Sequence, residues 1–279
     1  MFLDVKELAI FSTGLDLKQA CKISTHSSNS NDIIRNLAKL SPKYASRFEL
    51  FLRYHDLVKS GKLTDPIILL VIGGHASGKT SVTAELAFRM GLRNTIGADA
   101  IRECLRSVVP EEQYPLFFSS VYECWRVKYK KPTEHNIIKA YEEHSKCIAD
   151  AIERLLERCL RDGESVAIES LYLTQKLCGS TAFQNKSVIP MMLEVRDPKV
   201  HRERLLLRKS STHIRRDAER FIPVFNEIRV IQNHLVSLAR ENGIPIISND
   251  DFDKVVDECL DIAFDRVRVL VGEAEKVAE

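Results

Sequence analysis

Apolar and polar positions along the chain switch repeatedly between the period of a strand and the period of a helix. Residues 67–72 (Ile-Ile-Leu-Leu-Val-Ile) form a short, uniformly apolar run, which is typical of a strand buried on both faces of a parallel sheet. Further strands are expected at 94–97, 165–169, 188–195 and 245–248, and helices at 79–90, 100–107, 136–161, 200–207, 225–241 and 251–271. This alternation predicts an α/β fold with a parallel, doubly wound sheet.

The first part of the chain has a different pattern. Apolar residues recur at helical spacing over 5–10, 15–23, 33–40 and 44–58, and the polar stretch 24–32 is predicted to be a loop. Asp65-Pro66 marks a boundary, because proline disfavours helix at the residue before it. We therefore expect a small helical N-terminal region over 1–62 and an α/β domain over 63–279.

The first predicted strand leads directly into Gly73-Gly74-His75-Ala76-Ser77-Gly78-Lys79-Thr80, which matches the Walker A spacing G-x-x-x-x-G-K-[ST]. Glycines let backbone N–H groups approach phosphate oxygens, and the helix N-terminus, which includes Ser81, adds further donors and partial positive charge. Lys79 is expected to reach the β- and γ-phosphates and Thr80 to ligate Mg²⁺. His75 is counted with the nucleotide-binding loop, and its side chain could point to solvent. The pattern therefore predicts a P-loop for Mg²⁺ and ATP; the alternative is a glycine-rich turn that ends in Lys-Thr by chance.

This loop occurs in kinases, GTPases and motor ATPases alike, so other residues must indicate the reaction. The chain has no N-K-x-D element to select guanine. Asp99 follows the second predicted strand and could accept the proton of an attacking hydroxyl, or it could cap the helix expected from residue 100. Glu169 ends the third predicted strand and could hold Mg²⁺ or help to bind the acceptor, or it could simply face solvent. These carboxylates favour an ATP-dependent kinase.

A basic segment extends from Arg196 to Arg220, with nine Lys or Arg against four acids. Arg204 and Arg208 are four residues apart and share one helix face. The break at 210–212 (Ser-Ser-Thr) is typical of a hinge. We expect a lid whose arginines stabilise the transferring phosphoryl group while water is excluded, although a solvated charged face would have the same composition.

Composition narrows the class of protein further. Of the 279 residues, 44% are hydrophobic and 29% charged, and the net charge of +2 does not favour a nucleic-acid partner. The longest apolar run is far shorter than the ~20 residues that a membrane span needs. Seven scattered cysteines without a C-x-x-C pair predict reduced thiols. A cytoplasmic protein is expected, and the pattern does not define an oligomeric state.

Several segments resemble the archaeal 2-phosphoglycerate kinase family over about 63–260. They are the P-loop, 96–106 (IGADAIRECLR), 119–125 (SSVYECW), 166–173 (VAIESLYL), Arg220-Phe221, 228–232 (IRVIQ) and 243–249 (GIPIISN). The resemblance implies a three-layer P-loop kinase fold and transfer of the ATP γ-phosphate to a hydroxyl of 2-phosphoglycerate, giving 2,3-bisphosphoglycerate. Arg102, Arg106 and the lid arginines are then expected to bind the charges of the acceptor.

The chain departs from the family pattern at two places. The P-loop looks one residue shorter, and Tyr172 stands where the family tends to have a histidine on the acceptor side. Tyr172 is therefore expected at the acceptor. It also keeps open a paralogue that phosphorylates another hydroxyl-bearing metabolite. The remaining alternatives are a non-catalytic nucleotide-binding regulator, which intact Lys79 and Asp99 disfavour, and a nucleic-acid kinase, which the near-neutral charge disfavours.

Overall fold

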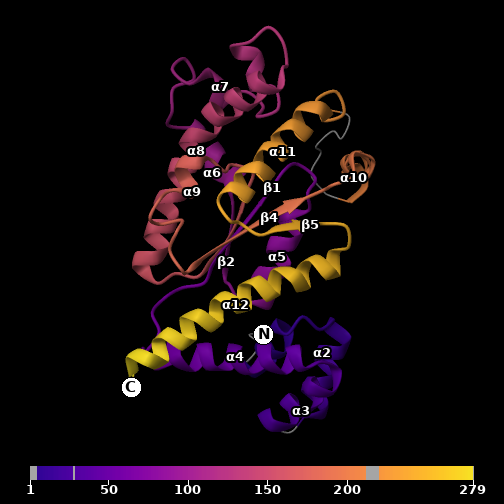
Figure 1. Ribbon diagram of the computed structural model, residues 1–279, viewed down its shortest axis with the longest axis vertical. Coiled ribbons are helices and arrows are strands. Elements are labelled where there is room, and N and C mark those ends of the chain that lie inside the picture. The colour runs from indigo at the N-terminus through magenta and orange to yellow at the C-terminus, as the bar shows by residue number, and fades with distance from the viewer. Residues whose placement is uncertain (1–4, 28, 212–219, 279) are drawn as a thin grey trace.

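The computed structural model describes residues 5–27, 29–211 and 220–278, and its centre is a five-stranded parallel sheet (Figure 1). The strands follow the spatial order β2-β3-β1-β4-β5. They are β1 (Ile68–Gly73), β2 (Asn94–Gly97), β3 (Val166–Ser170), β4 (Val188–Glu194) and β5 (Ile246–Ser248). Because β1 lies between β3 and β4, the chain winds first to one side of β1 and then to the other, as in a doubly wound sheet. The predicted α/β fold is confirmed.

Alternate residues of β1 belong to two hydrophobic cores, one on each face of the sheet. Ile68 and Leu70 lie in the core that also contains side chains of α8 and α11, whereas Leu69 and Val71 lie in the core formed with α5 and α12. The first layer consists of α6 (Ala98–Arg106), α7 (Pro115–Phe118), a 3₁₀ turn (Cys124–Val127), α8 (Glu134–Asp162), α9 (Gln175–Cys178), α10 (Pro198–Ser211) and α11 (Phe225–Glu241). The second contains α5 (Lys79–Arg89) and α12 (Phe252–Ala278). The uniformly apolar sequence of β1 is explained by this burial on both faces.

Most element boundaries agree with the prediction within about two residues, and the differences have local causes. The polar stretch 24–32, predicted as a loop, is helical at both ends, because α2 continues to His26 and α3 begins at Ser30. Its polar residues act as caps there: the Asn29 side chain accepts a hydrogen bond from the Asp32 N–H. The short elements α7 and α9 and the 3₁₀ turn were not predicted, since four residues are too few to establish a hydrophobic period. None of the helices within the described ranges has the length and apolarity needed to cross a bilayer.

Four helices precede the sheet: α1 (Val5–Ser12), α2 (Leu17–His26), α3 (Ser30–Leu40) and α4 (Pro42–Lys59). They share one hydrophobic core with α5, α12 and one face of the sheet. Phe48 and Phe51 of α4 are almost completely buried, and the Phe51 ring lies 6.5 Å from that of Phe264 in α12. The helical N-terminal region therefore covers the outer side of the α5–α12 layer.

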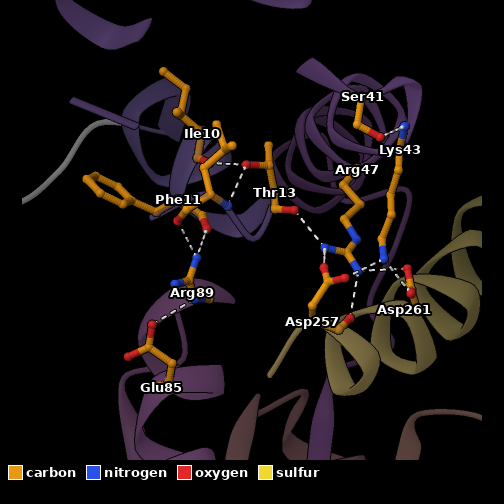
Figure 2. A network of polar contacts seen from close by, with 11 residues as sticks. Ile10, Phe11, Thr13, Ser41, Lys43, Arg47, Glu85, Arg89, Asp257 and Asp261 are labelled. Atoms are coloured by element: carbon orange, nitrogen blue, oxygen red, sulfur yellow. Dashed lines mark hydrogen bonds and ion pairs between the residues drawn. The ribbon is translucent and has the colours of Figure 1, made fainter. Parts of the chain in front are cut away.

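A polar network around the buried Arg47 joins α4 to α12 (Figure 2). The Arg47 side chain is 3% exposed and donates to the Thr13 carbonyl at 2.6 Å and to carboxylates of Asp257 and Asp261, both at 2.7 Å. Lys43 binds the other oxygen of each carboxylate, at 2.7 and 2.6 Å. Two cations and two anions alternate, so the buried guanidinium is matched in charge. Both of its terminal nitrogens donate hydrogen bonds, whereas the buried Nε has no hydrogen-bond partner.

Arg89 makes a second polar contact between the two parts of the chain (Figure 2). It lies at the end of α5 and donates to the Phe11 and Leu15 carbonyls at 3.1 and 2.8 Å, while Glu85 accepts from its Nε at 2.7 Å. The guanidinium thus binds one carbonyl in the last turn of α1 and one in the loop between α1 and α2. The N-terminal helices are therefore fastened to both α5 and α12.

Candidate active site

The segment from Gly73 to Thr80 connects the carboxyl end of β1 to the first turn of α5, as the Walker A pattern predicts. Gly78 is the N-cap residue of α5, with φ of 85°, and no side chain caps this helix. The first-turn N–H groups of α5 are thus directed at the loop, where an anion can bind them. Ala76 has φ of 58° and is the one non-glycine residue with positive φ in the described part of the chain. Such local strain is common where a backbone is shaped around a ligand.

Two distant side chains hold the P-loop from outside. Asn249, just after β5, donates from Nδ2 to the Ser77 carbonyl at 2.7 Å. His201 of α10 is fully buried and bonds through Nε2 to the His75 carbonyl at 2.7 Å. A carbonyl only accepts, so Nε2 carries the proton, and Nδ1 faces Arg229 Nη1 at 3.3 Å as an acceptor. Burial lowers the pKa of His201, which agrees with this neutral tautomer.

His75 does not point to solvent. Its side chain is 8% exposed, and its ring lies 4.0 Å from the Phe221 ring and 5.8 Å from the Tyr122 ring. The sequence contains no indication that residues 122 and 221 border the loop. The tertiary contacts turn this loop residue into part of an aromatic wall.

The two predicted carboxylates lie at neighbouring strand ends. Gly97 of β2 pairs with Glu169 of β3, and a side-chain Cβ at Gly97 would come within 3.3 Å of the Glu169 carboxylate. The absence of that side chain leaves room for Glu169 to reach the P-loop, where its Oε2 accepts from Thr80 Oγ1 at 2.5 Å. Glu169 is therefore engaged with the P-loop.

Asp99 lies in the first turn of α6, which begins at Ala98 rather than at the expected residue 100. Gly97 occupies the N-cap position, so the alternative of Asp99 as the N-cap is wrong. Its Oδ1 instead accepts a hydrogen bond of 2.8 Å from the Tyr172 hydroxyl. The Asp99 side chain remains 45% exposed.

A cavity of about 460 Å³ lies beside the P-loop and brings together residues from distant parts of the chain. Its charged lining is predominantly basic and consists of Lys79, Arg102, Arg106 and Arg220 together with Asp99 and Glu103. Arg106 donates to the carbonyls of Phe117 and Ser119, which fixes its guanidinium at the rim. A small anionic molecule could thus lie next to the phosphate loop.

Tyr172 and Arg204, two further predicted site residues, do not line this cavity. Tyr172 is 1% exposed and lies beneath Asp99 and Arg102, so it does not face the acceptor space. Arg204 is half-buried on α10 and is not among the residues that line the cavity. The Arg208 side chain and residues 212–219 of the predicted lid lie outside the described residues. Helix α10 continues through the predicted hinge to Ser211.

The parallel sheet, the phosphate loop at its switch point and the adjoining basic cavity define a P-loop kinase. Over 245 residues the chain is 34% identical to the 2-phosphoglycerate kinase of Methanopyrus kandleri, covering 88% of this chain and 72% of that protein. It is 31% identical over 214 residues to the enzyme of the same name from Methanocaldococcus jannaschii, covering 77% and 68%. The chain belongs to the 2-phosphoglycerate kinase family.

The chain is also similar to a solved structure, at lower identity. A gluconokinase structure from Sinorhizobium meliloti 1021 aligns with 75% of this chain and 98% of its own, with a TM-score of 0.46 and 17% identity. No family model matches the chain. The sequence did not indicate His201 as a P-loop contact and did not single out Asn249, although Asn249 lies in a segment that resembles the 2-phosphoglycerate kinases. Arg220, the last residue of the predicted lid, does line the cavity.

Proposed function

We propose that this protein transfers the γ-phosphoryl group of ATP to the hydroxyl of 2-phosphoglycerate, giving ADP and 2,3-bisphosphoglycerate. The observation that carries the proposal is the shared cavity, in which Lys79 of the P-loop, the base candidate Asp99 and three arginines border one space. A phosphorylated acid has two anionic groups, and the cationic lining matches that charge. Kinship to enzymes named for this acceptor supports the same conclusion.

The nucleotide phosphates are assigned to the P-loop, with backbone amides of 73–81 around them and the Lys79 ammonium at the β- and γ-phosphates. Mg²⁺ would be held by Thr80 and Glu169, whose oxygens already converge to 2.5 Å. No group of three or more His, Cys, Asp or Glu in the described ranges forms a metal cage. Mg²⁺ at nucleotide sites typically takes one or two carboxylates together with phosphate oxygens, so the residues present fit it. When bound, Mg²⁺ neutralises charge on the β- and γ-phosphate oxygens.

The acceptor is assigned to the basic cavity. Asp99 accepts the proton of the attacking hydroxyl while the hydroxyl oxygen forms its bond to the γ-phosphorus and ADP leaves. Arg102 and Arg106 orient the acceptor through its phosphate and carboxylate, which a guanidinium can bind in bidentate fashion. Stabilisation of the transferring group by Arg204 and Arg208 of the predicted lid stays a prediction, as does the expected cytoplasmic location.

A paralogue that uses another small hydroxyl compound is the second candidate. Tyr172 is the residue that favours it, because the family tends to have a histidine there. The phenol is buried beneath Asp99 and Arg102, and this weakens the case for a direct effect on acceptor choice. The anionic acceptor therefore remains the favoured one.

The test is a transfer assay with labelled ATP and a panel of acceptors: 2-phosphoglycerate, 3-phosphoglycerate, glycerate and gluconate. We expect 2-phosphoglycerate to give the highest kcat/KM, and Asp99→Asn to lower kcat at least about 100-fold, as for removal of a general base. Asp265→Asn, an exposed carboxylate on α12, is the matched control and should retain wild-type rates. Preference for gluconate or glycerate would select the paralogue, and no transfer to any acceptor despite Mg·ATP binding would select a regulator.

A further inference from the structure

Tyr172 connects two residues of the acceptor cavity without entering the cavity itself. Its hydroxyl lies 2.8 Å from Asp99 Oδ1 and 3.0 Å from Arg102 Nη1. The backbone around it is fixed by Ser170, whose Oγ accepts from the Tyr172 N–H at 2.8 Å and donates to the Tyr172 carbonyl at 3.3 Å. With 1% of its surface exposed, the side chain has little freedom to move.

The chemistry of the three groups determines the direction of both hydrogen bonds. A guanidinium has donors only and an ionised carboxylate has acceptors only, so the phenol accepts from Arg102 and donates its single proton to Asp99. Burial, followed by the neighbouring Asp99 carboxylate, raises the pKa of Tyr172 well above its usual value. The hydroxyl therefore keeps its proton, and the order Arg102→Tyr172→Asp99 is maintained throughout the neutral pH range.

The hydroxyl lies between two opposite charges, of which Arg102 also donates to the Glu103 carboxylate from Nε and Nη2, at 3.3 and 3.1 Å. Asp99 and Arg102 are three residues apart on one face of α6, and their closest atoms, Oδ1 and Nη1, lie 3.7 Å from each other. A direct charge-assisted hydrogen bond would have a length of about 2.7–2.9 Å. Closure to that distance would direct the carboxylate and the guanidinium toward each other, away from the acceptor that both are assigned to bind.

His144 of α8 lies against the Tyr172 ring. The two rings are nearly parallel, with an interplanar angle of 17° and centroids 5.9 Å apart, and His144 is fully buried. Burial, followed by the nearby Arg102, lowers the pKa of His144 to about 4. The imidazole is therefore neutral at pH 7 and adds no third cation next to Arg102 and Arg106.

We propose that Tyr172 is a positioning residue of this kinase, whose hydroxyl separates Asp99 from Arg102 and orients the carboxylate toward the acceptor, with His144 holding its ring in place. The inference rests on the proposed function, because it gives Asp99 the role of base and Arg102 the role of acceptor ligand. Tyr172 thus affects the reaction through Asp99 and Arg102 and does not itself contact the acceptor.

The first test is Tyr172→Phe, which removes one oxygen and keeps the ring and its stacking. We expect kcat to fall about 10-fold and the acceptor KM to rise several-fold, because Asp99 and Arg102 each lose one hydrogen bond. The loss of a single hydrogen bond to a charged group has an effect of roughly this size. The ATP KM should not change. Tyr54→Phe is the matched control: its ring is also buried, and its hydroxyl bonds to the Asp65 carbonyl at 3.4 Å on the N-terminal side. It should leave all three constants unchanged.

A double-mutant cycle separates positioning from a general structural effect. In the Asp99→Asn background, Tyr172→Phe should have less than about one third of its effect on kcat, because residues that act as a unit are not additive. Equal effects in both backgrounds, or a wild-type kcat for Tyr172→Phe, would overturn the inference and leave the proposed function intact. A wild-type rate for Asp99→Asn would instead refute the base assignment on which both depend.

Arg102→Gln supplies a second test that does not require Tyr172→Phe to fold. It removes the cation while the phenol still donates to Asp99, so the acceptor KM should rise about 10-fold or more and kcat should retain at least about half of its value. A loss of kcat as large as that of Asp99→Asn would show that the arginine orients the carboxylate. That result would overturn the positioning role of Tyr172.

Discussion

Acidification should destabilise this protein through His144, a buried imidazole with cationic neighbours. The side chain is fully buried, which opposes its protonation most strongly. Arg102 and, more weakly, Arg106 of α6 also oppose it, whereas the Ser119 backbone and Asp99 favour it. Its pKa is lowered from 6.5 to about 4. The unfolded chain therefore binds a proton at higher pH than the folded chain does. The stabilising contribution is complete above pH 6.5, decreases as the pH falls below 6.5, and is lost near pH 4.

The gap between these two pKa values corresponds to about 3 kcal/mol of folding free energy, which is lost in full once the folded state is protonated as well, and most of it is lost by about pH 4.5. The measurement is urea unfolding at about pH 7 and about pH 4.5 for the wild type and for His144→Phe, which keeps a ring beside Tyr172. Carboxylates that titrate in the same interval contribute equally to both proteins. The difference between the two pH values should therefore be smaller in the variant by about 2–3 kcal/mol.

His135→Gln controls for the removal of one histidine, because residue 135 is exposed near the start of the same helix. It should show the wild-type difference between the two pH values. The prediction fails if the pH-dependent difference in unfolding free energy agrees between wild type and His144→Phe within about 0.5 kcal/mol, which is near the error of the extrapolation. The burial of His144 beside the arginines would then not be the cause of the acid destabilisation.

Three further predictions concern the P-loop and the N-terminal region. Lys79→Ala should weaken Mg·ATP binding at least about 10-fold in calorimetry, and undiminished binding would contradict the assignment of the phosphate site. Asn249→Ala removes the hydrogen bond to the Ser77 carbonyl and should raise the ATP KM about 10-fold with little change in acceptor KM, whereas an equal rise in both would indicate a general loss of order. Arg47→Leu should lower the free energy of unfolding by about 2 kcal/mol, because it removes the buried cation of an ion-pair network. Lys43→Leu, at a more exposed site of the same network, should lower it by less than about 1 kcal/mol. Equal losses would argue against a special contribution of the buried arginine.

The sequence by itself determined those features that depend on neighbouring residues. The apolar run of β1, the loop from Gly73 to Thr80 and the helical period of α5 are contiguous, so their pattern is sufficient to predict strand, phosphate loop and helix. The apolar pattern placed Asp99 and Glu169 at predicted strand ends. Because ligands bind at the carboxyl ends of parallel strands, both carboxylates were expected near the nucleotide. The kinase class and its family could therefore be inferred before any contact was known.

Only the tertiary structure decided which side chains meet around the site. Tyr172 bonds to Asp99 across 73 positions, His201 to the His75 carbonyl across 126, and Asn249 to the Ser77 carbonyl across 172. Such contacts depend on strand order and on the angles at which helices leave the sheet, and neither is encoded in a local hydrophobic period. For the same reason the sequence could indicate that Tyr172 is unusual, whereas its burial beneath the cavity follows from the packing of α6 and α8 on the sheet.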